Sequence, residues 1–195
     1  MRYLLVLVLL LVGCTPTATQ SSSPSAPSSG TPEPSPTCSP LSSTPYPCST
    51  GEYQEVEEQN QLSKDAQAVY RAYWKENVRL QKAGGTKSPT PALKRVLAQP
   101  ALDQAMEVYR ELKSEGARAV GGTWKLLKLT PQPTRTVEGS ITSLSVCWRT
   151  VGVSFVTARE KFPSGTVTVI ESSFFKHVGP DLKLFHVTSK KVSKC

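Results

Sequence analysis

Length, composition and charge already exclude several classes of protein. The chain has 195 residues, is 38% hydrophobic, and carries 23 Lys+Arg against 15 Asp+Glu, a formal net charge of +8. This length allows one folded domain and not two large ones, and no apolar run after residue 13 is long enough to span a membrane. The composition divides the chain into residues 1–13, 14–51 and 52–195, of which only the last is typical of a folded domain.

The first segment predicts export. Arg2 supplies a positive charge, and residues 4–12 are an unbroken run of Leu and Val. As a helix this run reaches about 14 Å at 1.5 Å per residue, well short of a hydrocarbon core of about 30 Å. We therefore expect a signal peptide rather than a membrane span.

The end of this run resembles the bacterial lipobox. Residues 11–14 read Leu-Val-Gly-Cys, similar to the Leu-x-Gly-Cys motif in which the Cys sulfur receives a diacylglyceryl group. The resemblance implies cleavage between Gly13 and Cys14, and a lipid-anchored chain at the outer face of the cell membrane. Two or three acyl chains hold a protein stably on a bilayer. An ordinary signal peptide with an incidental Cys14 is the alternative.

The second segment predicts a tether. From residue 15 to residue 50, 27 of 36 residues are Ser, Thr or Pro, and Glu33 is the only charged residue. Such a composition favours an extended chain without a packed core. It also suits O-glycosylation of an exported protein.

The remaining cysteines suit an oxidising compartment. Without Cys14 the chain has Cys38, Cys48, Cys147 and Cys195, an even number that permits three disulfide pairings. We favour Cys38–Cys48 as a local loop and Cys147–Cys195 as a link between the last residue and a strand; free thiols are the alternative. We expect no metal and no cofactor, because no Cys-x-x-Cys is present and the chain has only two His.

The folded segment predicts helices first and strands afterwards. Apolar residues recur at helical spacing over residues 61–80, a short helix starts at Thr90-Pro91 and ends at Leu97, and a third runs from Pro100 to Gly116. Strands are expected at 123–130, 137–150, 151–159, 166–178 and 182–192, with turns at 163–165 and 179–181. Helices that precede an antiparallel sheet define an α+β fold.

This order of elements, over residues 60–195, resembles the NTF2-like (SnoaL-like, cystatin-like) cone, in which a curved sheet wraps the helices. The chain also resembles exported lipoproteins of high-GC Gram-positive bacteria that carry such a domain behind a lipobox and a Ser/Thr/Pro tether, with a cysteine in a central strand like Cys147. The resemblance implies a cavity inside the cone, which holds small molecules in related enzymes.

Candidates for catalysis are few. The strand half contains the acidic residues Glu138, Glu160, Glu171 and Asp181 and no Tyr. An isomerase-like pair would therefore need a helix tyrosine, whereas Tyr70, Tyr73, Trp74 and Tyr109 are expected to be core residues. His177 and His186 are interpreted as ordinary strand residues. Since general acid–base chemistry needs a positioned titratable group, we expect no enzyme; a deep open pocket with Glu138 or Glu171 near a helix tyrosine would favour one.

Charge is unevenly distributed along the folded segment. Residues 51–116 carry ten basic and ten acidic side chains, whereas residues 117–195 carry twelve basic and four acidic ones. Such a local field attracts anionic wall polymers, lipid headgroups or an acidic protein; a solvated basic surface is the alternative. The candidate binding residues are Lys125, Lys128, Lys190 and Lys191, although the last two also suit an edge strand protected from pairing. Nucleic acid is not expected.

These observations favour a membrane-anchored, non-catalytic binding module for an envelope component or a partner protein. One alternative is a small-molecule binder or SnoaL-like enzyme that uses the cone cavity. Another is a lipoprotein of a mobile element that affects DNA entry or transfer.

Overall fold

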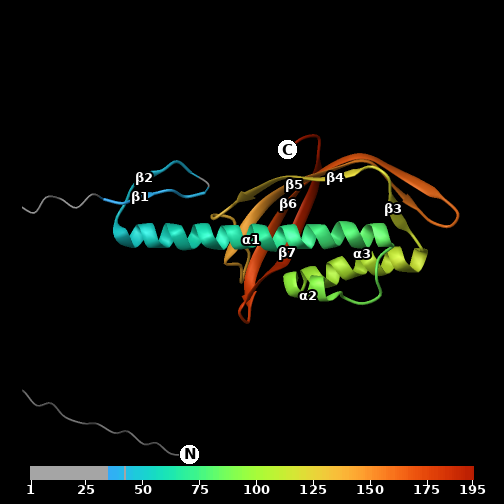
Figure 1. Ribbon diagram of the computed structural model, residues 1–195, viewed down its shortest axis with the longest axis horizontal. Helices are drawn as coiled ribbons and strands as arrows, with labels where there is room; N and C mark the ends of the chain where they lie inside the picture. The colour runs from blue at the N-terminus through green and yellow to red at the C-terminus, as the bar shows by residue number, and fades with distance from the viewer. Residues whose placement is uncertain (1–34, 42) are drawn as a thin grey trace, which may run out of the picture. The chain divides into compact units, whose positions relative to one another are not determined.

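The computed structural model describes residues 35–195 except Ser42 and the side chain of Ser164. The expected signal peptide, Gly13, Cys14 and the first part of the expected tether lie outside these residues. Residues 35–195 form one compact unit. Its elements are a short hairpin, three helices and then an antiparallel sheet (Figure 1).

The helices follow the local signals of the sequence. They are α1 Thr50–Ala83, α2 Pro91–Val96 and α3 Ala101–Glu115. Thr90 Oγ1 accepts a hydrogen bond from the Leu93 backbone N–H at 3.2 Å and caps α2, and Gly116 ends α3 at φ 62°. The short helix and the third helix are thus confirmed. α1 begins before the predicted residue 61, because Ser49 accepts a hydrogen bond from the Glu52 N–H and starts the helix.

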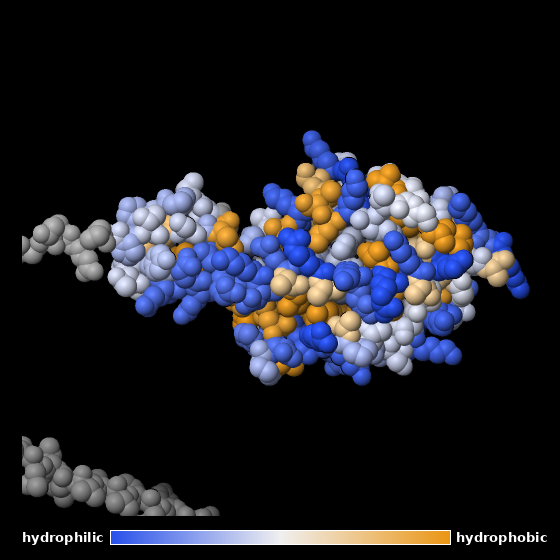
Figure 2. Space-filling model, in the orientation of Figure 1, coloured by the Kyte–Doolittle hydropathy of each residue, from blue (hydrophilic) through white to orange (hydrophobic). Residues whose placement is uncertain are grey.

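The hairpin packs on the first half of α1. Strands β1 Thr37–Cys38 and β2 Tyr46–Pro47 pair antiparallel, and a disulfide joins Cys38 to Cys48, whose Cα atoms lie 5.8 Å apart. The Asn60 side chain of α1 accepts a hydrogen bond from the Leu41 N–H at 2.9 Å and donates one to the Ser39 carbonyl at 3.0 Å. Residues 35–49 are therefore structured despite their tether-like composition, and the boundary at residue 52 falls inside α1. The exposed side of this half of α1 is hydrophilic (Figure 2).

The sheet is an antiparallel meander. Its strands are β3 Arg118–Val120, β4 Thr123–Pro131, β5 Thr142–Val156, β6 Lys161–Val178 and β7 Asp181–Val192. β3 and β4 both pair with β5, which pairs with β6, which pairs with β7. One parallel bridge joins Leu97 to Leu184 at the β7 edge. The α+β class is confirmed: the helices lie on one side of an open sheet (Figure 1).

Two details of the predicted strands are wrong. Residues 137–150 and 151–159 do not form separate strands, because β5 runs continuously through Gly152, where a register shift marks a bulge and φ is 65°. Residues 163–165 are not a turn but part of β6; the chain reverses before them, where the Thr157 N–H bonds to the Glu160 carbonyl at 2.9 Å. The turn at 179–181 is confirmed, since Val178 pairs with Asp181.

The core lies between the helices and one face of the sheet. Tyr70, Met106 and Tyr109 from the helices form one buried cluster with Leu144 and Val146 of β5. Because side chains alternate along a strand, the residues between these on β5 lie on the opposite side, which we call the helix-free face. Within the described residues, no helix is long and apolar enough to cross a membrane.

Candidate functional site

The helix-free face carries rows of side chains that are aligned by strand pairing. Each row contains one residue from each of β4, β5, β6 and β7. The first row is Lys125, Arg149, Thr168 and Val192; the second is Lys128, Cys147, Ile170 and Lys190; the third is Thr130, Ser145, Ser172 and Thr188. These rows contain four cations and no Asp or Glu.

Strand pairing places the four lysines that the sequence suggests as binding residues on two different faces of the sheet. Lys125, Lys128 and Lys190 lie on the helix-free face. Lys191 pairs with Val169, opposite Trp148, and thus belongs to the face that the helices cover. The structure adds two arginines that sequence reasoning missed: Arg149 in the first row, whose Nε donates to Thr168 Oγ1 at 3.0 Å, and Arg135 in the β4–β5 loop.

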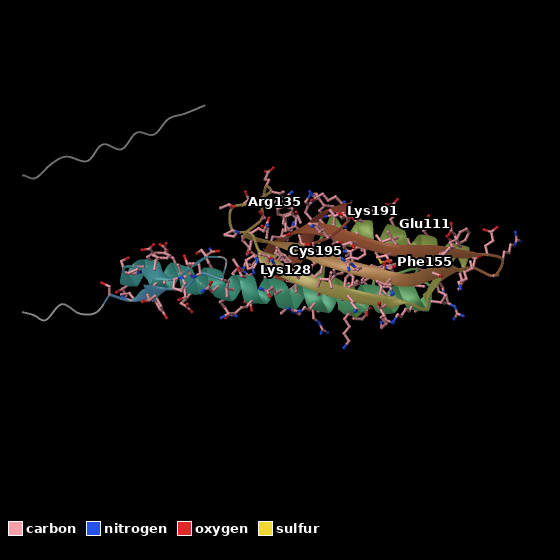
Figure 3. The ribbon with its side chains drawn as sticks, turned by 90° about the horizontal axis from the view of Figure 1, so that it is seen from above. Glu111, Lys128, Arg135, Phe155, Lys191 and Cys195 are labelled. Carbon is pink, nitrogen blue, oxygen red and sulfur yellow. A yellow bond between two sulfur atoms is a disulfide. The ribbon has the colours of Figure 1, made fainter. Side chains whose placement is uncertain are left out.

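A disulfide attaches the last residue to the middle of this face. The Cα atoms of Cys147 and Cys195 are 6.1 Å apart, in the pairing that we favoured. Seen from above, Cys195 and Lys128 lie along the strands, whereas Arg135 lies by the loop at the end of the sheet (Figure 3). In the described part of the chain, the one group of three potential metal ligands is Cys38, Cys48 and Glu52. Both of its sulfurs are held in a disulfide.

The helix-covered face contains one enclosed carboxylate. Tyr70 OH of α1 donates to Glu171 Oε2 at 2.5 Å, and Trp148 Nε1 donates to Glu171 Oε1 at 2.8 Å. Burial raises the pKa of Glu171, and these two hydrogen bonds oppose that rise only in part. Burial also raises the pKa of Tyr70 well above its ordinary value. Both carboxylate oxygens are thus engaged by protein donors.

A small pocket lies on the same face beyond Trp148. It has a volume of about 180 Å³, and its walls include Asn77, Gln81, Trp124 and Trp148. Asn77 Oδ1 accepts hydrogen bonds from Tyr109 OH and Gln81 Nε2, both at 2.9 Å. Glu171 does not line this pocket. The structure therefore brings Glu171 to a helix tyrosine, but as a satisfied polar pair and not as a group of this pocket.

The other candidate catalytic residues lie on different elements of the fold. Glu138 is exposed in the β4–β5 loop, Glu160 is exposed in the β5–β6 turn, and His177 is exposed near the end of β6. Asp181 is exposed, 4.0 Å from the Lys183 ammonium. His186 packs against the Phe174 and Phe185 rings, with centroid distances of 5.7 and 6.4 Å.

Comparisons with known proteins give no family for this chain. No family model matches it, and no curated protein matches it. A de novo designed β-sheet protein solved by NMR has a TM-score of 0.35 at 17% identity, covering 67% of this chain and 92% of the design. The intermembrane space region of the chloroplast protein ARC6 has a TM-score of 0.41 at 16% identity, covering 66% of this chain and 98% of that one. Neither likeness indicates a function.

Proposed function

We propose that this chain is a lipoprotein anchored at the outer face of the cell membrane through Cys14. Its folded part, an NTF2-like domain, is a non-catalytic module that binds an anionic component of the cell envelope. One observation carries the binding function: Lys125, Lys128, Arg149 and Lys190 share the helix-free face with no acidic residue in their three rows.

The electrostatics of this face support an anionic partner. Clustered cations with no Asp or Glu in their rows produce a local positive potential that concentrates anions and speeds their association, and salt weakens this potential. The acidic residue of these strand segments, Glu171, is held on the opposite face by Tyr70 and Trp148. Because its two oxygens are already occupied by donors, it supports the architecture rather than acid–base chemistry.

The anchor is tested by metabolic labelling with a fatty-acid analogue. Cys14→Ala removes the only sulfur at the lipobox position, so the variant is expected to lose the label completely. Thr15→Ala, which changes the neighbouring residue and keeps Cys14, is expected to retain it. Label that persists in Cys14→Ala contradicts the anchor.

The binding face is tested by co-sedimentation of the detergent-purified full-length chain with wall fragments from its source cells. Reversing Lys125, Lys128 and Lys190 to Glu is expected to weaken binding about tenfold or more at low salt, and less at high salt. The matched control reverses three exposed lysines of α1, Lys64, Lys75 and Lys82. Binding that is independent of salt, or that falls equally in the control, overturns the proposed function.

A further inference from the structure

A pocket of about 210 Å³ opens on the helix-free face between β6 and β7. Its walls are Arg135, Ile170, Ser172, Thr188, Ser189 and Lys190. We infer that this pocket is a binding site for a phosphate-type oxyanion, either a phosphomonoester or one unit of a phosphodiester polymer. The inference deepens the proposed function, on which it rests for the location of its ligand in the envelope.

Of the three hydroxyl residues in the pocket walls, Ser172 and Thr188 belong to the helix-free face and have no protein partner for their hydroxyls in the described part of the chain. Ser172 and Thr188 are directly paired residues of β6 and β7, so their Cβ atoms lie about 5 Å apart. Ser172 is only 6% exposed, yet neither hydroxyl forms a hydrogen bond with any described residue. Thr188 is exposed and Ser172 lines the pocket, so both hydroxyls are free to bind a ligand.

Two cations complete the pocket from separate elements. Lys190 comes from β7, and Arg135 comes from the β4–β5 loop. The backbone at Arg135 is held in place, because Ser143 Oγ donates to the Arg135 carbonyl at 2.6 Å and the Arg135 N–H donates to the Gln132 carbonyl at 3.1 Å. Among the described residues, no carboxylate lies within 4.0 Å of either cationic group. Both charges are therefore available to a ligand.

The kind of donor determines the kind of ligand. A guanidinium offers a planar fork of N–H groups and an ammonium offers three donors, and neither can accept a hydrogen bond. With two hydroxyls added, the donors exceed what the two oxygens of a carboxylate can use. A phosphate group presents three or four oxygens and binds such sets well. Ile170 supplies an apolar wall against which the carbon atoms of a phosphate ester pack.

A polymer can extend from this pocket across the sheet. Lys190, Ile170, Cys147 and Lys128 form one row. Neighbouring strands are about 4.8 Å apart, so Lys128 lies about 14 Å from Lys190. Cys195 is attached to Cys147 in this row, so a phosphodiester chain with one phosphate in the pocket must pass beside Cys195 to reach this second cation. A single phosphate ester does not reach it.

The test is calorimetric titration of detergent-purified full-length protein with inorganic phosphate, with glycerol 3-phosphate and with a soluble glycerol-phosphate polymer at constant ionic strength. We expect saturable binding. Arg135→Gln and Lys190→Gln should each weaken it about tenfold, and Ser172→Ala about threefold or more. Lys191→Gln makes the same change in charge one residue away, on the other face, and should leave the dissociation constant unchanged.

The outcomes separate the site from the proposed function. The site is overturned if Lys190→Gln and Lys191→Gln weaken binding equally, or if none of the three probes binds saturably. This holds even where wall fragments still sediment with the protein. Saturable phosphate binding without sedimentation leaves the site standing and overturns the envelope function. If the polymer binds more tightly than glycerol 3-phosphate, and Lys128→Gln removes this difference, the polymer is the ligand. If the two probes bind equally well, the single ester is the ligand.

Discussion

Replacing Cys147 and Cys195 by serine is expected to lower the free energy of unfolding by about 4 kcal/mol. The two residues are 48 positions apart in the sequence, so their disulfide closes a long loop. Such a link stabilises chiefly by restricting the unfolded chain, and the effect grows with loop length. The loop includes all of β6 and β7, and the link attaches the last residue to the centre of the helix-free face.

Urea unfolding of the full-length protein measures this effect. Cys38→Ser with Cys48→Ser is the matched control, because these residues are 10 positions apart and the same reasoning gives about 3 kcal/mol. The Cys38–Cys48 link closes only the N-terminal hairpin and leaves the sheet untouched. A larger loss for this control than for the Cys147–Cys195 pair contradicts the prediction.

Replacing Glu171 by alanine is expected to cost about 3 kcal/mol of folding free energy. The substitution leaves the Tyr70 hydroxyl and the Trp148 indole N–H without their acceptor, and each unsatisfied buried donor costs about 1–3 kcal/mol. Glu171→Gln keeps an acceptor and nearly the same volume, so it should cost clearly less. The measurement is again urea unfolding, and equal stability of the alanine variant and the wild type would contradict a structural role.

The same carboxyl predicts how stability depends on pH. Burial raises the pKa of Glu171 in the folded protein, so the folded protein holds this proton more tightly than the unfolded chain does. Its contribution is therefore fully present below the unfolded pKa of about 4.3 and is lost as pH rises through the folded pKa. The stability of the wild type relative to Glu171→Gln should therefore fall as pH rises above about 4. A constant or rising difference contradicts the shift.

Local chemistry determined the elements that are confirmed. Thr90 followed by Pro91 starts a helix because the hydroxyl caps the free N–H groups and proline fits the first turn. Gly116 ends the next helix because it adopts the left-handed conformation without strain. These signals act over a few residues, so they can be read without knowledge of the fold.

Local signals of this kind gave wrong predictions where contacts between distant residues determine the structure. We predicted a break between residues 150 and 151 and a turn at residues 163–165. Both places lie at or beside register shifts within the long β5–β6 ladder, where bulges accommodate them. Residues 35–49 have no apolar pattern. A disulfide and the Asn60 side chain nevertheless hold them against α1.

The sequence by itself determined the α+β class, the turn before β7 and the excess of positive charge after residue 117. Only the tertiary structure decided which charges act together. Lys190 and Lys191 are neighbours in the chain but lie on opposite faces, whereas Glu171 meets Tyr70 across 101 positions. Alternation along a strand is local, but register depends on pairing with distant strands and on bulges, and a shift of one residue exchanges the two faces.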